Sequence, residues 1–321
     1  MKSKILYNGF LDALRKKVPQ NAVLANQLAE ILTIEKEAVY RRLRGEVPFT
    51  FFEIAAISRE LNISLDGLIG IGSTITRSFQ LRLMEYVQPS EEHIRTLDTL
   101  AELVVRSQEL PESEIAYAGN MLPSPLFLAY ENLTRFYHFK WLYQYGRETD
   151  VKPLAQVHIS AEMDEVYRKF IRGTRQIRTT YYILDYMIFQ YLINDIRYFE
   201  SIRLITRPEV EQLRVDILRL LDDLERIAAK GEYLKNEHPV YVYISHINLA
   251  TNYCYFETPE VTLSMIKVFT LNEIVSEDDE SFGKIKTWVR SLKRLSTMIS
   301  VSGERSRIEF FDKQRERIGQ L

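Results

Sequence analysis

The spacing of apolar residues in the first seventy positions predicts several short helices around one small core. From Val23 to Leu68, apolar residues recur every three or four positions and are interrupted by short polar gaps. This is the period of helices that bury one face. The same spacing upstream predicts another helix from Lys4 to Lys17, which ends before Pro19.

Within this region, two helices are predicted to pack across a tight turn. The apolar positions that would face one another are Leu28, Ala29 and Leu32 before the turn, and Val39 and Leu43 after it. The second helix keeps cations and a tyrosine on surface that this core does not use. A short helix of this kind, supported by the helix before it, suits the major groove of DNA.

These residues resemble the Cro/C1-type helix-turn-helix family, also called XRE or lambda-repressor-like, whose members are DNA-binding transcription regulators. The positions that match the family pattern are Leu28-Ala29, Ile34, Val39, Arg44-Gly45, Pro48 and the run from Leu61 to Asp66. The resemblance covers roughly residues 21–70. It implies an all-α DNA-binding domain over residues 1–70, with double-stranded DNA as its partner.

The resemblance also implies roles for individual side chains. The candidates for reading base edges are Lys36, Glu37, Tyr40 and Arg41. Contacts near helix ends and from flanking cations fix the register without reading sequence. The candidates for such phosphate contacts are Asn26, Gln27, Arg42 and Arg44.

Two positions depart from the family pattern. The turn position that is commonly glycine in the family is Thr33. Threonine tolerates a left-handed backbone poorly, so we expect a slightly different turn. A usual apolar position late in the recognition helix is Arg42, and Leu43 takes the apolar role one residue later. This leaves open whether Arg41 or Arg42 points toward DNA.

The charge balance limits how the protein could hold DNA. The chain has 42 basic and 44 acidic residues and a net charge of -2, so any DNA affinity must come from a local patch. Residues 1–70 hold ten Lys plus Arg against eight Asp plus Glu, a local balance of +2. Because this charge is modest, we expect a homodimer whose two patches add on one duplex.

The composition, 46% hydrophobic and 27% charged, is that of an ordinary soluble protein. Cys254 is the single cysteine, which excludes an intramolecular disulfide and favours a reducing cytoplasm. The longest apolar run, Tyr181 to Ile193, is interrupted by Asp185 and Gln190. It is shorter than the roughly 20 residues that cross a bilayer. We therefore expect a cytoplasmic protein with no membrane partner.

Beyond Gly70 the pattern changes. Glycines at 70 and 72 predict a hinge over residues 71–78, followed by an α+β sensor or dimerisation domain over residues 79–321. Strands are predicted at 114–118 and 179–186, long helices between and after them, and a hairpin of 241–245 with 252–257. Strands, then helices, then a meander are compatible with a PAS-like or GAF-like domain.

Little in the larger region indicates chemistry. There is no phosphate-binding glycine loop, no histidine pair at metal-ligand spacing and no catalytic set, so we expect neither cofactor nor metal and no enzyme activity. The acidic run 277–280 and the Ser281 to Lys284 pattern are interpreted as a helix start.

Two further stretches have alternative interpretations. The aromatic stretch 136–145 favours a core or a subunit interface over an effector pocket. His246, Asn248 and Asn252 favour turn chemistry over a small-molecule site. The sequence therefore predicts a sequence-specific transcription regulator with an unidentified small-molecule effector or a dimerisation role. The alternatives are a protein-interaction scaffold that uses the helical domain to bind its partner and, last, an enzyme with an attached DNA-binding domain.

Overall fold

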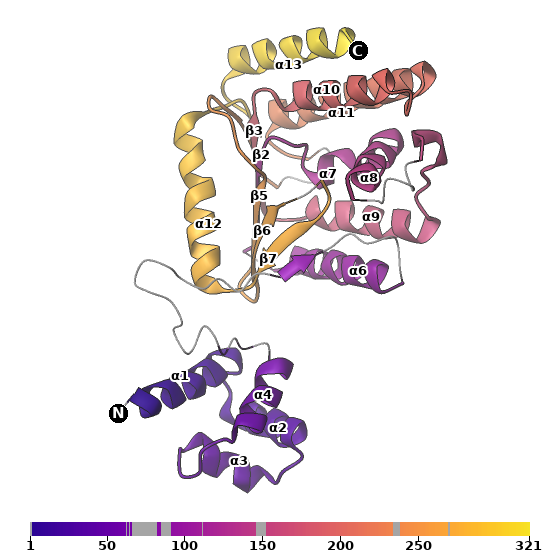
Figure 1. The fold of residues 1–321 in the computed structure, drawn as a ribbon. Helices are drawn as coiled ribbons and strands as arrows, with labels where there is room; N and C mark the ends of the chain where they lie inside the picture. The colour runs from indigo at the N-terminus through magenta and orange to yellow at the C-terminus, as the bar shows by residue number, and fades with distance from the viewer. Residues whose placement is uncertain are drawn as a thin grey trace. The chain divides into compact units, whose positions relative to one another are not determined.

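The computed structural model describes residues 2–61, 63, 65, 82–84, 91–110, 112–145, 152–233, 238–268 and 270–321. The chain divides into two compact units, residues 1–80 and 81–321, whose elements are labelled in Figure 1. The predicted hinge at 71–78 lies outside the described residues.

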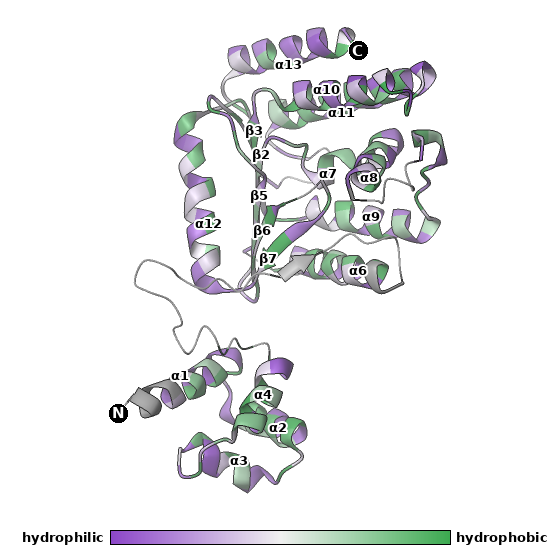
Figure 2. Cartoon of the chain, viewed as in Figure 1, coloured by the Kyte–Doolittle hydropathy of each residue, from purple (hydrophilic) through white to green (hydrophobic). Residues whose placement is uncertain are grey.

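The first unit is all helical in its described residues. Its helices are α1 (Lys2–Lys17), α2 (Asn21–Leu32), α3 (Lys36–Leu43) and α4 (Phe51–Glu60). Ten buried side chains from these helices and the α3–α4 loop form one core: Phe10, Leu11, Leu14, Leu24, Ala25, Leu28, Val39, Leu43, Phe49 and Ile57. The predicted helical period is therefore confirmed, and Figure 2 shows apolar residues along α2 and α4.

The described part of the second unit contains an eight-stranded sheet in the order β1-β7-β6-β5-β2-β3-β4-β8. The strands are β1 (Arg82–Met84), β2 (Glu114–Gly119), β3 (Thr179–Asp185), β4 (Val240–Ser245), β5 (Tyr253–Glu257), β6 (Thr262–Lys267), β7 (Glu273–Ser276) and β8 (Ser296–Met298). The central β2, β3 and β4 run parallel, whereas the outer strands pair antiparallel.

Helices cover both faces of this sheet (Figure 1). They are α6 (Glu91–Arg106), α7 (Ser124–Phe127), α8 (Glu131–Tyr145), α9 (Ala161–Thr174), α10 (Ile188–Ser201), α11 (Arg207–Lys230), α12 (Asp279–Leu292) and α13 (Glu304–Gly319). Short 3-10 turns span Ser107–Glu109, Leu154–Gln156 and Lys293–Leu295. On one face, α12 packs Phe282, Val289 and Leu292 against β2, β3 and β5. The helices α6 to α11 pack on the other face.

The predicted mixture of helices and strands is confirmed, but the predicted hairpin is wrong. The strands β4 and β5 are neighbours in sequence, yet β2 and β3 lie between them in the sheet. Strand β4 pairs with β3 and β8, and β5 pairs with β2 and β6. The centre of the sheet is parallel and joined by helical crossovers, whereas β5, β6 and β7 form an antiparallel meander.

The aromatic stretch 136–145 belongs to the core, as favoured from its composition. It lies on α8, where Phe136, Tyr137, Phe139 and Trp141 are all at most 3% exposed. The rings of Phe136 and Phe139 contact Phe199 of α10 edge-on, at centroid distances of 6.1 and 4.8 Å. Such pairs hold α8 against α10 through shape as well as buried area.

A lysine at the end of α12 gives the second unit a pH dependence. The Lys293 ammonium lies 3.2 Å from the centroid of the Tyr181 ring, and burial lowers its pKa to about 8. Between about pH 8 and pH 10, the unfolded chain holds this proton longer than the folded chain does. The free energy of unfolding should therefore rise with pH in that window.

We expect the urea midpoint of the wild type to increase with pH in this window. In Lys293→Met the increase should be smaller, because the part that comes from Lys293 is absent. Above about pH 10 the trend should reverse, because burial raises the pKa of Tyr181 to about 12 while unfolded tyrosine ionises. Lys284→Met, on the exposed side of the same helix, is the matched control and should keep the wild-type slope. An unchanged slope in Lys293→Met would contradict the assignment.

Candidate nucleic-acid interface

The helix α3 is fixed from its inner side by the core of the first unit. Val39 is 0% exposed and Leu43 is 7% exposed. Arg15 of α1 donates a 3.2 Å hydrogen bond to the carbonyl oxygen of Leu43, one of the carbonyls that a helix end leaves without an intrahelical partner. The helix is therefore held at its middle and at its C-terminal end.

The turn between α2 and α3 has the left-handed geometry that the sequence made us doubt. Thr33 adopts φ 54° and ψ 45°, and its backbone N–H donates to the carbonyl oxygen of Glu30 at 3.3 Å. The N–H of Ile34 donates to the carbonyl oxygen of Ala29 at 3.2 Å. The expected change in the turn is thus wrong, because these two hydrogen bonds hold threonine in a conformation that usually favours glycine.

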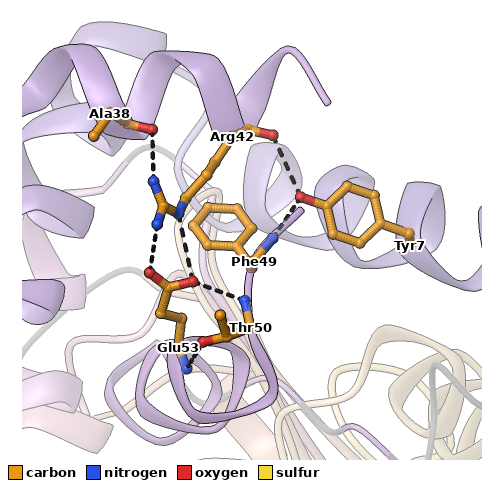
Figure 3. Close-up of polar contacts among 6 residues, drawn as sticks. All are labelled: Tyr7, Ala38, Arg42, Phe49, Thr50 and Glu53. Carbon is orange, nitrogen blue, oxygen red and sulfur yellow. Dashed lines mark hydrogen bonds and ion pairs between the residues drawn. The ribbon is translucent and has the colours of Figure 1, made fainter. Parts of the chain in front are cut away.

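Arg42 supports α3 from within the unit (Figure 3). Its Nη2 lies 2.8 Å from Oε1 of Glu53 on α4, and its Nη1 donates to the carbonyl oxygen of Ala38 at 3.2 Å. The two charged side chains are only 18% and 17% exposed. Glu53 also accepts a 2.7 Å hydrogen bond from the N–H of Thr50, the N-cap of α4.

This arrangement sets the charge of Glu53. Burial acts to raise its pKa, but the hydrogen bonds from Thr50 and from the Arg42 guanidinium outweigh burial and lower the pKa. The ionised pair ties α3 to the start of α4, while Tyr7 joins the carbonyl oxygen of Arg42 to the N–H of Phe49. Arg42 therefore stabilises the packing of α3 on α4. Of the two arginines Arg41 and Arg42, Arg41 has the more exposed side chain.

The remaining predicted residues lie largely at the surface. Exposed side chains are those of Asn26, Gln27, Lys36, Glu37, Arg41 and Arg44, and Tyr40 is half-buried against the core. Six of the eight predicted positions thus present accessible polar groups on α2 and α3. The amide and cationic groups among them can donate to phosphate oxygens or to base edges, whereas the Glu37 carboxylate can only accept, for example from a base amino group.

An acidic residue that the sequence did not single out connects two of these cations. Glu46 lies 2.7 Å from Nε of Arg44 and 3.4 Å from Nε of Arg41, and Glu37 lies 3.3 Å from Nη2 of Arg44. The hydrogen bond to Glu46 raises the pKa of Arg44 and, reciprocally, lowers that of Glu46. Gly45, at φ 76°, makes the turn that brings Glu46 back toward α3.

The weaker candidates in the second unit have ordinary structural roles. Asp278 caps α12 by accepting from the N–H of Ser281 at 2.8 Å, so the acidic run is a helix start. Asn252 accepts a hydrogen bond from the N–H of Met121, whereas His246 bonds to Thr297. Because their hydrogen bonds go to different strands and loops, they do not converge on one site.

Within the described ranges, no three His, Cys, Asp or Glu side chains come together in a way that could hold a metal ion. No helix in the described part of the chain is long and apolar enough to cross a bilayer. Comparisons with protein-family models, with curated proteins and with solved structures returned no match.

Proposed function

We propose that the protein is a DNA-binding transcription regulator that reads DNA with the exposed side of α3. The observation that carries this proposal is the two-sided character of α3. Its inner side chains Val39 and Leu43 are buried, while Lys36, Glu37 and Arg41 are exposed. A short helix held from behind by its neighbours can present such groups to a major groove without losing its own shape.

The ion pairs at Glu46 are compatible with this role. The side chains of Arg41, Arg44 and Glu46 are about half exposed, at 55%, 52% and 47%. Ion pairs at exposed positions contribute little to stability, because water screens them. Phosphate oxygens could therefore replace Glu46 as the partner of either guanidinium at little cost. Glu46 would meanwhile reduce the attraction of α3 for DNA in general, because it cancels part of the local positive charge.

The second unit is proposed to hold two copies together and to respond to an effector. In a homodimer, two copies of α3 would enter successive major grooves about 34 Å apart. Each copy would contribute its own patch, which is needed because residues 1–70 carry a balance of only +2. An effector that favours one dimer geometry would change the spacing and thus the affinity.

The direct test starts with selection of bound duplexes from a random pool, followed by salt titrations on selected and random sequences. Arg41→Ala should weaken binding to the selected sequence by about tenfold or more, because a base contact contributes about 1 to 3 kcal/mol. Arg44→Ala should weaken binding to all sequences alike and lower the salt dependence.

Arg59→Ala is the matched control, since it removes the same charge from an exposed position on α4, where the Arg59 side chain is 80% exposed. It should leave the ratio of selected to random affinity unchanged. If Arg41→Ala and Arg59→Ala have the same effect on that ratio, Arg41 does not read bases. If the wild type retains no duplex even at low salt, the DNA proposal fails and a protein-binding role for the helical unit is favoured.

A further inference from the structure

A cavity of about 160 Å³ lies in the second unit, on the face of the sheet that α6 and α9 cover. Its walls come from α6, α9, the loop after β2, and strands β2, β5 and β6. It lies between two separate core clusters, one built around Met163 and Val166 of α9 and the other around Val104 of α6 and Phe256 of β5. Protein interiors are closely packed and contain few spaces larger than a water molecule, and this partly open cavity is larger than that.

The walls of the cavity are mainly hydrocarbon. Leucines 97, 100 and 103 and Val104 line it from α6, while Ile115 and Phe256 line it from the sheet. Val104 is 6% exposed, Ile115 is 2% exposed and Phe256 is 1% exposed. A cavity with such walls favours an apolar occupant over water, because water would find few hydrogen-bond partners there.

Four polar side chains that line the cavity, those of His138, Tyr167, Lys267 and Glu273, are engaged with protein partners. The carbonyl oxygen of Thr134 can only accept, so Nδ1 of His138 donates to it at 2.8 Å. The Nε2 atom of His138 then accepts a hydrogen bond from the hydroxyl of Tyr167 at 2.8 Å. The cation Lys267 lines the cavity, and its Nζ lies 2.8 Å from Oε1 of Glu273, so the two charges compensate one another. A charged ligand would have to break this pair or remain uncompensated.

From this geometry we propose that the cavity binds one small, uncharged, apolar molecule about the size of a single aromatic ring. Apolar protein cavities of about 150 Å³ take up benzene, which sets the scale. The chemical class is thus a monocyclic aromatic or a short aliphatic compound without a carboxylate or an amine.

The cavity also lies against α6, which is the first helix of the second unit within the described residues. We assign it as the effector site, an assignment that rests on the proposed DNA-binding function. Occupancy would fill the space between α6 and the sheet and so favour one placement of α6 over others. Binding of the ligand itself does not depend on DNA.

The binding test uses the full chain with toluene and benzoate, which share the ring and differ in charge. Toluene should bind saturably in calorimetry and raise the thermal midpoint, whereas benzoate should do neither. Val104→Phe fills the cavity and should lower toluene affinity by about tenfold or more, equivalent to at least about 1.4 kcal/mol. Val215→Phe makes the same change where the residue is 41% exposed on α11, and should bind toluene as the wild type does.

If Val104→Phe fails to fold, Leu263→Ala gives the complementary test, because it enlarges the cavity. This variant should bind naphthalene, which the wild type should exclude. Equal toluene affinity in the wild type and Val104→Phe, or preferential binding of benzoate, would overturn the site.

The second arm measures DNA affinity with and without toluene. A shift in the wild type that is absent in Val104→Phe supports the effector assignment, and toluene binding without any shift overturns that assignment. Absence of DNA binding in the toluene-free wild type would instead refute the proposed function, while the calorimetric result would still decide the site.

Discussion

Replacing Leu28 with alanine is expected to unfold the first unit and leave the second unit folded. Leu28 is 0% exposed in the core that joins α2, α3 and α4. Removing a buried leucine side chain costs about 2 to 5 kcal/mol. The described part of this unit has a core of ten buried side chains, and so small a core provides little stability in excess of this loss. DNA binding, if it depends on α3, should disappear together with the fold.

The chain offers a clean way to separate the two units. Both tryptophans, Trp141 and Trp288, lie in the second unit, so tryptophan fluorescence reports on that unit. In Leu28→Ala, hydrogen exchange of peptides from α2 and α3 should become fast while the fluorescence transition in urea keeps its midpoint. Leu295→Ala, at a position 48% exposed, is the control and should change neither. A matching shift of both signals in Leu28→Ala would mean that the units unfold together.

Gly119→Ala is expected to destabilise the second unit by about 2 to 3 kcal/mol, in the upper part of the range for overpacking a core. A methyl group at this position would overlap the side-chain amide of Asn252 and lie 2.8 Å from its Cα. The strand β2 is paired with β3 on one side and β5 on the other, so it cannot simply move away. The displacement should also break the hydrogen bond from the N–H of Met121 to Asn252.

Urea unfolding followed by tryptophan fluorescence measures this loss directly. Gly283→Ala is the matched control, because nothing lies within 4 Å of the new methyl group and the position is inside α12. That substitution should stabilise the unit by about 0.5 to 1 kcal/mol, since alanine is the better helix former. Similar behaviour of the two variants would show that the contact with Asn252 yields more easily than the geometry indicates.

The local features of the first unit could be predicted from the sequence because they depend on local spacing. The apolar period gave the helices, and it also indicated that Lys36 and Arg41 would be exposed. The role of Arg42 in stabilising the packing of α3 on α4 could not be predicted. Its partner Glu53 lies eleven residues later on another helix, beyond the three- or four-residue spacing at which helical neighbours are recognised. Glu46 was missed for a similar reason, since only the turn at Gly45 brings it back to α3.

In the second unit, the strands themselves were easier to predict than their partners. The segments that form β2, β3, β4 and β5 have clear strand patterns, but no local pattern shows that β2 and β3 separate β4 from β5. The short β8 was missed. Strands of three or four residues carry too few positions for alternation to appear.

The pairing of β1 with β7 has a consequence for synthesis of the chain. Arg82 lies opposite Val275, and β1 is an edge strand whose neighbour in the sheet is β7. Ribosomes add about 5 to 20 residues per second, so roughly 10 to 40 s separate the appearance of the two strands. During that interval all residues of the first unit have been synthesised, while β1 has no β7 to pair with. In a nascent chain, the sequence of the helical first unit is therefore complete well before the sheet of the second unit can form.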